Sequence, residues 1–125
     1  MARVFLADPL VEERSAFRVL LLDLRMELAG EASDWLSLYS QAGPSCPDMI
    51  LVSWELLPKK YVNAIDRLRK NCPDARIVVI VNQEGDCQDM IETSGVDAVI
   101  SKEDFPYKVV DILRMAVADK DSSRR

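Results

Sequence analysis

The chain has 125 residues, of which 49% are hydrophobic and 30% charged, and this composition is typical of a single globular domain. The net charge of −5 argues against nonspecific nucleic-acid binding, and no apolar run is long enough to span a membrane. Three separated cysteines (Cys46, Cys72 and Cys87) indicate free thiols in a reducing cytoplasm, while the absence of histidine excludes Ser–His and Cys–His nucleophile pairs and histidine metal sites.

The amino-terminal segment changes from a strand pattern to a helix pattern. Residues 4–7 form a short apolar run that predicts a first strand ending before Asp8 and Pro9. Hydrophobic residues then recur at helical spacing, which predicts an amphipathic helix with Asp23 on its polar side near the carboxyl end. The apolar stripe of this helix consists of Phe17, Leu20, Leu21 and Leu24.

The rest of the chain alternates apolar runs with amphipathic segments. The β-branched run at residues 77–81 is typical of a central parallel strand that is covered on both faces. Gly43 and Pro44 are expected to end the second helix, and Pro106 to begin the last one. The other predicted strands are residues 26–32, 49–52 and 98–100, and the predicted helices are residues 34–41, 58–71, 86–93 and 106–118.

Five strands alternating with five helices predict a flavodoxin-like α/β fold, a doubly wound five-stranded parallel sheet with strand order 2-1-3-4-5. We expect one domain at residues 1–118, followed by a polar tail or linker at residues 119–125. In such sheets the functional site lies at the carboxyl ends of the strands. The residues expected there are Asp8, Pro9, Ser53, Trp54, Glu55, Val81, Asn82, Ser101 and Lys102.

Four segments carry a resemblance to a known family that covers nearly the whole chain. "VFLADPLVEERSAFRVLL", "PDMILVSWELL", "PDARIVVIVN" and "GVDAVISKEDFPYKVVDILRMAV" resemble the receiver (CheY-like) domains of response regulators. The family's spacing leads from the first-strand acid Asp8 to Ser53 as the match of the phospho-accepting aspartate. Asp23, within "LLLDLRM", lies too close to Asp8 and is not that acceptor.

The resemblance implies a phosphate pocket, and this chain departs from it at several positions. Pro9 replaces one of two adjacent acids that hold Mg²⁺, and Ser53 replaces the acceptor carboxylate. A serine hydroxyl is a poor nucleophile without an activating base. The remaining substitutions are Val81 for the hydroxyl residue after strand 4, with Asn82 beside it, and Val99 for the switch aromatic of strand 5.

Only Asp8 and Lys102 of that pocket remain. The chain therefore resembles a pseudo-receiver, a receiver fold without phosphotransfer, and we expect it to bind no metal and no cofactor. Structural roles are also open for these residues. Asp8 could cap the first helix with Pro9 at its first position, or pair with Lys102. Ser53 is most simply a small polar filler. Glu55 is the substitute acid nearby, and a solvated loop carboxylate is favoured over an inward-facing one.

The resulting hypothesis is a non-enzymatic, non-phosphorylatable signalling module that acts by protein–protein interaction in two-component or transcriptional regulation. Two alternatives remain: a receiver that accepts phosphate on Ser53 or Glu55, and a sensor of an anion or small molecule beside Lys102. We expect a cytoplasmic domain without direct nucleic-acid binding. A protein partner or second copy is expected on the last helices and strand 5, at Met90, Ile91, Leu113, Met115 and Val117.

Overall fold

Five parallel strands form the centre of the molecule, in the order β2-β1-β3-β4-β5. This computed structural model describes residues 1–83 and 95–123. The strand order is the one predicted, so the flavodoxin-like architecture is confirmed. The strands are β1 (Arg3–Ala7), β2 (Glu27–Ala32), β3 (Met49–Ser53), β4 (Arg76–Val81) and β5 (Ala98–Ser101).

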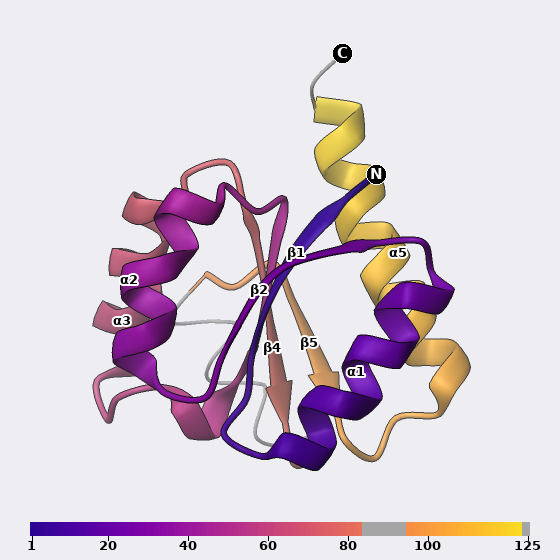
Figure 1. Cartoon of the computed structure of the whole chain (residues 1–125), viewed down its shortest axis with the longest axis horizontal. Helices are drawn as coiled ribbons and strands as arrows, with labels where there is room; N and C mark the ends of the chain where they lie inside the picture. Colours follow the sequence, from indigo (N-terminus) through magenta and orange to yellow (C-terminus); the bar gives the residue numbers. More distant parts are fainter. Residues whose placement is uncertain (84–94, 124–125) are drawn as a thin grey trace.

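Helices cover both faces of the sheet, with α1 and α5 on one side and α2 and α3 on the other (Figure 1). Four α-helices lie among the described residues, one fewer than expected, because the predicted helix at 86–93 falls outside them. Within the described ranges, no helix combines the length and the apolar composition needed to cross a membrane. The helices are α1 (Val11–Asp23), α2 (Trp35–Ser45), α3 (Tyr61–Asn71) and α5 (Pro106–Ser123), with the 3₁₀ turn η1 (Trp54–Leu56) after β3.

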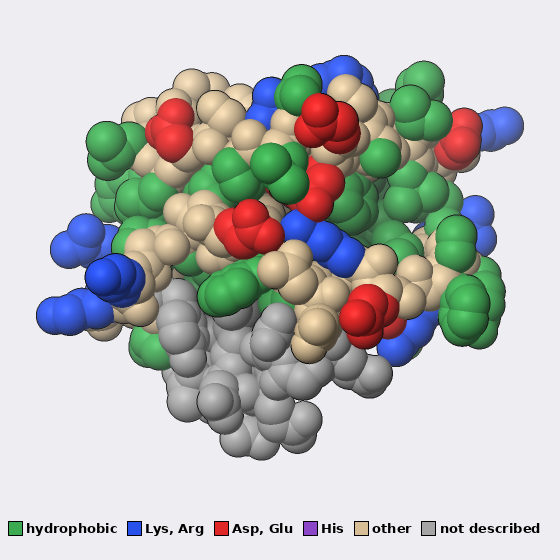
Figure 2. Space-filling view, turned by 90° about the horizontal axis from the view of Figure 1, so that it is seen from below, with side chains coloured by type: hydrophobic (Ala, Val, Ile, Leu, Met, Phe, Trp, Pro, Cys, Tyr) green, Lys and Arg blue, Asp and Glu red, His purple; other side chains and the backbone are tan. Residues whose placement is uncertain are grey.

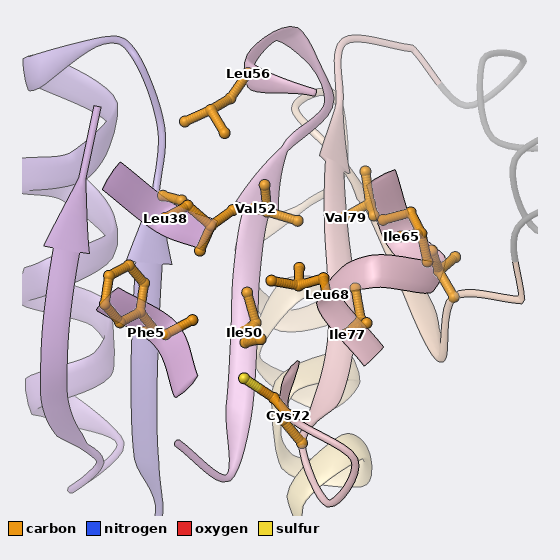
Figure 3. Close-up of a cluster of buried hydrophobic side chains, with 14 of the residues drawn as sticks. Phe5, Leu38, Ile50, Val52, Leu56, Ile65, Leu68, Cys72, Ile77 and Val79 are labelled. Atoms are coloured by element: carbon orange, nitrogen blue, oxygen red, sulfur yellow. The ribbon is translucent and has the colours of Figure 1, made fainter. Parts of the chain in front are cut away.

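The core is divided by the sheet into two layers, because successive side chains of a strand point to opposite faces. In β1, Phe5 packs with α2 and α3, as Figure 3 shows, whereas Val4 and Leu6 pack with α1 and α5. All residues of β3 are buried, which explains its uninterrupted apolar sequence. The predicted inward stripe of α1 faces this core, with Leu21 buried and the other three residues partly buried.

Helix α1 starts later than expected, and this corrects the prediction that Asp8 caps it. Leu10 is the N-cap residue and Val11 the first helical residue. The Asp8 carboxylate instead accepts a hydrogen bond from the Leu10 backbone N–H at 2.9 Å. This two-residue turn accommodates Pro9 before the helix begins, because Asp side chains commonly bond to the backbone two residues on. Asp23 is the last residue of α1, as predicted.

Helix α2 continues past the predicted stop at Gly43 and Pro44 and ends at Ser45. A proline in the last turn removes only one backbone donor, so the helix tolerates it there. The Ser45 hydroxyl donates to the Gln41 carbonyl at 2.7 Å, which satisfies an acceptor at the same helix end. Cys46 then takes a left-handed conformation, with φ of 48°, and terminates the helix.

Candidate functional site

The carboxyl ends of the strands bring the predicted site residues to one edge of the sheet. Asp8 follows β1, Ser53 ends β3 and Lys102 follows β5. The arrows of β4 and β5 point down in Figure 1, and Figure 2 looks at the molecule from that side. Near the centre of this view a basic side chain lies between acidic ones. The predicted clustering at one edge is therefore present in the structure.

Lys102 is held between two carboxylates that come from different elements. Its ammonium Nζ lies 2.7 Å from Glu13 Oε1 in α1 and 3.3 Å from Glu55 Oε1 in η1. Partial burial lowers the pKa of Lys102, but the hydrogen bonds and charges of both acids outweigh burial and raise the pKa above its usual value. We call Asp8, Glu13, Glu55 and Lys102 the central cluster.

Asp8 is fully buried, and its pKa is raised to about 7. Burial is the main cause, and the adjacent Glu13 carboxyl adds to it, while the Leu10 N–H and the Lys102 charge act in the opposite direction. Burial also raises the pKa of Glu13, but hydrogen bonds from Asp8 and Lys102 outweigh it and bring that pKa below its ordinary value.

The two carboxyl groups share one proton in the arrangement that best satisfies them. Asp8 Oδ2 and Glu13 Oε2 are both buried, and no N–H or O–H group in the described part of the chain donates to either. A proton carried by Asp8 and directed at Glu13 satisfies both oxygens at once and leaves a single negative charge facing Lys102.

Ser53 occupies the end of β3 and has no room to act as an exposed nucleophile. Its side chain is fully buried, and its hydroxyl has no hydrogen-bond partner among the described residues. Its neighbour across the sheet is Ile80 of β4. A buried hydroxyl without a hydrogen-bond partner lowers the stability of the fold. No contact among the described residues orients this hydroxyl for a reaction, so Ser53 acts as a small side chain that fills space at the strand end.

The end of β4 contributes apolar volume and a backbone acceptor to this edge. Val81 is buried, and its carbonyl accepts the Lys102 backbone N–H at 2.8 Å, which fixes where the lysine leaves the sheet. The Asn82 side chain is exposed, while its carbonyl accepts the Ser101 hydroxyl at 3.4 Å. The polar groups that accept these hydrogen bonds at the end of β4 are therefore backbone carbonyls, and β4 itself contains no side chain with a hydroxyl.

Comparisons with known proteins identify the architecture. No protein-family model matches the chain, and no curated protein matches it. Solved structures do match over nearly the whole length. A CheY-like receiver domain protein from Methanospirillum hungatei JF-1 has a TM-score of 0.84 at 12% identity, with 98% of each chain covered. The receiver domain of AraT, a response regulator from Geobacillus stearothermophilus, has a TM-score of 0.83 at 18% identity, with 99% of this chain and 98% of that chain covered.

The isolated receiver domain of RcsB from Salmonella enterica, solved with the phosphomimetic BeF₃⁻, gives a TM-score of 0.77 at 15% identity, with 95% and 97% coverage. The chain has the fold of a response-regulator receiver domain. The sequence-based resemblance and the structural likeness therefore agree on the receiver fold.

The Mg²⁺ site expected of a phosphorylated receiver does not fit the residues present at this edge. Pro9 offers no ligand, and Ser53 supplies a hydroxyl where a carboxylate is needed. The Lys102 ammonium already contacts two of the acids that could bind a cation. Within residues 1–83 and 95–123, no three Asp, Glu or Cys side chains converge in a geometry suited to a metal ion.

Two expectations about the pocket need correction. Lys102 contacts Glu13 and Glu55 directly, not Asp8, because Glu13 reaches between Asp8 and the ammonium. Glu55 is not simply solvated, since its carboxylate turns to Lys102 while its side chain stays 36% exposed. Glu13 was missed altogether, although an acid at the third position of a helix commonly reaches back toward the residues before it.

The expected interface on the last helix is only partly at the surface. Leu113 is fully buried and Val117 is partly buried against the core, so neither can form a docking surface as placed here. Met115 is 65% exposed. Met90 and Ile91 lie outside the described residues.

Proposed function

We propose that this chain is a receiver-fold signalling module that is not phosphorylated and acts by binding protein partners. The observation that carries the proposal is the buried Ser53 hydroxyl at the position that matches the acceptor, on the same sheet edge as a lysine that is already paired within the chain. In a receiver this lysine is expected to face the acceptor carboxylate. Here Glu13 and Glu55 pair with this lysine, so its ammonium is not free to receive a phosphoryl oxygen.

The chemistry of phosphotransfer argues in the same direction. A serine hydroxyl needs a base to become nucleophilic, and the chain has no histidine to provide one. The possible bases in the central cluster are carboxylates, and those of Glu13 and Glu55 are already paired with Lys102. Attack on phosphorus would also bring several negative oxygens beside these carboxylates without a metal ion to offset the repulsion.

One observation favours an alternative acceptor. The Glu55 carboxylate lies 3.3 Å from Lys102, as an acceptor carboxylate beside the lysine would. Its position in η1, two residues after β3, differs from the strand-end position expected of the acceptor. Phosphorylation of Glu55 is therefore the second candidate function, and the experiment below separates it from the first.

The test is incubation with acetyl phosphate and Mg²⁺, followed by intact-mass spectrometry. We expect no phosphorylated species for the wild-type chain. Ser53→Ala and Glu55→Gln serve as matched variants, because an adduct lost in one of them would locate a true acceptor and overturn the proposal. The double variant Pro9→Asp with Ser53→Asp restores the missing acids and is the positive control for a gain of Mg²⁺ binding by calorimetry.

The proposed partner surface includes the start of α5. Phe105 and Tyr107 are 68% and 70% exposed, and their rings stack with centroids 5.8 Å apart. Exposed aromatic side chains are common anchors of protein interfaces. Together with the exposed Met115 they support a protein partner or a second copy at α5. We also propose that the domain acts in the cytoplasm without direct nucleic-acid contact. Sedimentation of wild type and of Met115→Glu over a concentration series tests the second-copy version.

A further inference from the structure

A notch between the starts of α2 and α3 combines an aromatic wall with basic side chains. It has a volume of about 170 Å³, and we call it the α3 notch. Both helices begin at the carboxyl edge of the sheet, so the notch lies on the same edge as the central cluster but on the α2–α3 side. It is lined by Trp35, Pro58, Lys60, Asn63, Ala64 and Arg67.

The two basic side chains of the notch have no ion-pair partner among the described residues. Lys60 and Arg67 are exposed, and neither takes part in an ion pair within the described ranges. Asp66, beside Arg67 in the sequence, pairs with Lys70 instead, at 3.3 Å. Basic side chains are visible at the left of Figure 2, on the side that carries α2 and α3.

The start of α3 adds to this charge. Lys60 is the N-cap residue, and no side chain caps the helix. The backbone N–H groups of the first turn therefore point outward with the positive end of the helix dipole. Lys59 precedes them and is exposed. In a chain with a net charge of −5, this is a local reversal of sign that favours an anionic ligand.

The size and lining of the notch restrict what that ligand can be. Small-molecule sites usually enclose about 300–1,000 Å³, so the notch is too small for a nucleotide and suits a single side chain. Trp35 packs against the core and against Tyr39, with ring centroids 5.8 Å apart, so its ring is a fixed wall and not a mobile one. Pro58 and Ala64 add to the apolar part of the lining.

We propose that the α3 notch receives an acidic segment of a protein partner. One apolar side chain of the segment packs against Trp35, and flanking carboxylates pair with Lys60 and Arg67, while Asn63 is available to hydrogen-bond the partner's backbone. This inference rests on the proposed protein-binding function and names the chemistry of the partner. Rim charges of this kind set specificity and association rate more than they add affinity, so they also give the partner its orientation.

The experiment uses the full chain and a short acetylated and amidated peptide in which Asp and Glu flank a central leucine. The two tryptophans give two indole N–H signals in NMR, and Trp54→Phe assigns them. We expect the Trp35 signal to shift saturably and the Trp54 signal to stay. A peptide with serine in place of leucine should bind more weakly, because it leaves the aromatic wall uncovered.

Charge reversal provides the matched control. Lys60→Glu with Arg67→Glu should weaken peptide binding by about tenfold or more, because attraction becomes repulsion at both positions. Arg114 in α5 is also exposed and outside the ion pairs of the described chain, so Arg114→Glu tests a charge reversal away from the notch. It should leave the affinity within about twofold.

Three results would overturn the inference: no saturable shift of Trp35, an equal loss in the Arg114→Glu variant, or equally tight binding of a DNA oligonucleotide of the same charge. The last would make the notch a general polyanion site. These outcomes are independent of the phosphorylation test. A phosphoryl adduct with intact peptide binding removes the proposed function alone, whereas absent peptide binding without an adduct removes the notch alone.

Discussion

The central cluster and the α3 notch lie on the same edge of the sheet and treat charge in opposite ways. In the cluster, Lys102 lies 2.7 Å from Glu13 and 3.3 Å from Glu55, and Asp8 shares a proton with Glu13, so the ammonium is fully engaged by acids of the same chain. In the notch, Lys60 and Arg67 are exposed and form no ion pair with a described residue. The difference is that the lysine of the cluster has no free charge to offer, whereas the basic side chains of the notch are available to the acidic partner that we propose.

The largest effect on this comparison is expected from Ser53→Asp. A new carboxylate at a fully buried position would face the Asp8–Glu13 pair, and Lys102 is already shared between two acids. We expect a loss of at least about 3 kcal/mol in the free energy of unfolding, measured with urea at pH 7. Ser53→Ala is the control and should stay within about 1 kcal/mol of wild type, since it only removes an unpartnered hydroxyl. An unchanged midpoint for Ser53→Asp would show that this position is open to solvent.

The second-largest effect is expected when the Lys102 ammonium is removed from the central cluster. Lys102→Met leaves Glu13 and Glu55 beside the buried Asp8 without a positive charge, and should lower the free energy of unfolding at pH 8 by about 2 kcal/mol. Lys70→Met breaks an exposed ion pair with Asp66, at 3.3 Å, and should change the free energy of unfolding by less than about 0.5 kcal/mol. Equal losses in both variants would mean that the cluster is no more than a surface ion pair.

The proton of the Asp8–Glu13 pair makes a prediction about pH. The folded state holds this proton up to about pH 7, while an unfolded Asp releases it near its ordinary pKa of 3.8. Between these values the unfolded state binds fewer protons, so this group makes the free energy of unfolding fall as the pH rises. The charged groups that act on the Asp8 carboxyl are Glu13 and Lys102. Arg14 also contacts this residue, because its guanidinium donates to the backbone carbonyl of Asp8 at 2.7 Å.

Asp8→Asn imitates the protonated form. Its amide oxygen can accept the Leu10 N–H, and its NH₂ can donate to Glu13. We expect the variant to be more stable than wild type by about 1–2 kcal/mol at pH 8 and equally stable at pH 4, from urea unfolding across that range. Asp23→Asn, at the exposed end of α1, makes the same exchange outside the central cluster and serves as the matched control. A parallel profile for Asp8→Asn and wild type would contradict the shared proton.

The smallest effect belongs to the α3 notch. Lys60→Glu with Arg67→Glu should change the free energy of unfolding by less than about 0.5 kcal/mol, because exposed side chains without partners carry little stability. Circular dichroism with thermal unfolding measures it. A large loss here would mean that the notch is structural, and the peptide experiment would need a milder variant such as Lys60→Gln.

The fold was predictable from the sequence because its signals are local and redundant. The β-branched run of β4 and the helical spacing of Phe17, Leu20, Leu21 and Leu24 each specify an element and the face that it buries. The end of α2 was not predictable from Gly43 and Pro44, since a proline in a last turn costs one hydrogen bond and the packing of Leu38 and Ala42 outweighs it.

The position of the candidate site was predictable from the sequence, but the contacts between its side chains were not. The strand ends placed Asp8, Ser53 and Lys102 correctly, because strand order and direction decide which ends meet. Which acid contacts Lys102 depends on side-chain reach across a helix start, and residue spacing carries no such information. Glu13 had only one usable signal, its third position in a helix that directly follows Asp8.

Lys102 also changes how the site relates to its surroundings. A bound metal ion can be removed by a chelator or lost when its free concentration falls, whereas a cation attached to the backbone beside Val81 stays at a fixed, high effective concentration. The contacts of Glu13 and Glu55 with this ammonium therefore persist whether the surrounding solution is rich or poor in divalent ions. Dilution, dialysis and EDTA leave this counter-ion in place, and one is supplied with every copy of the chain that is synthesised.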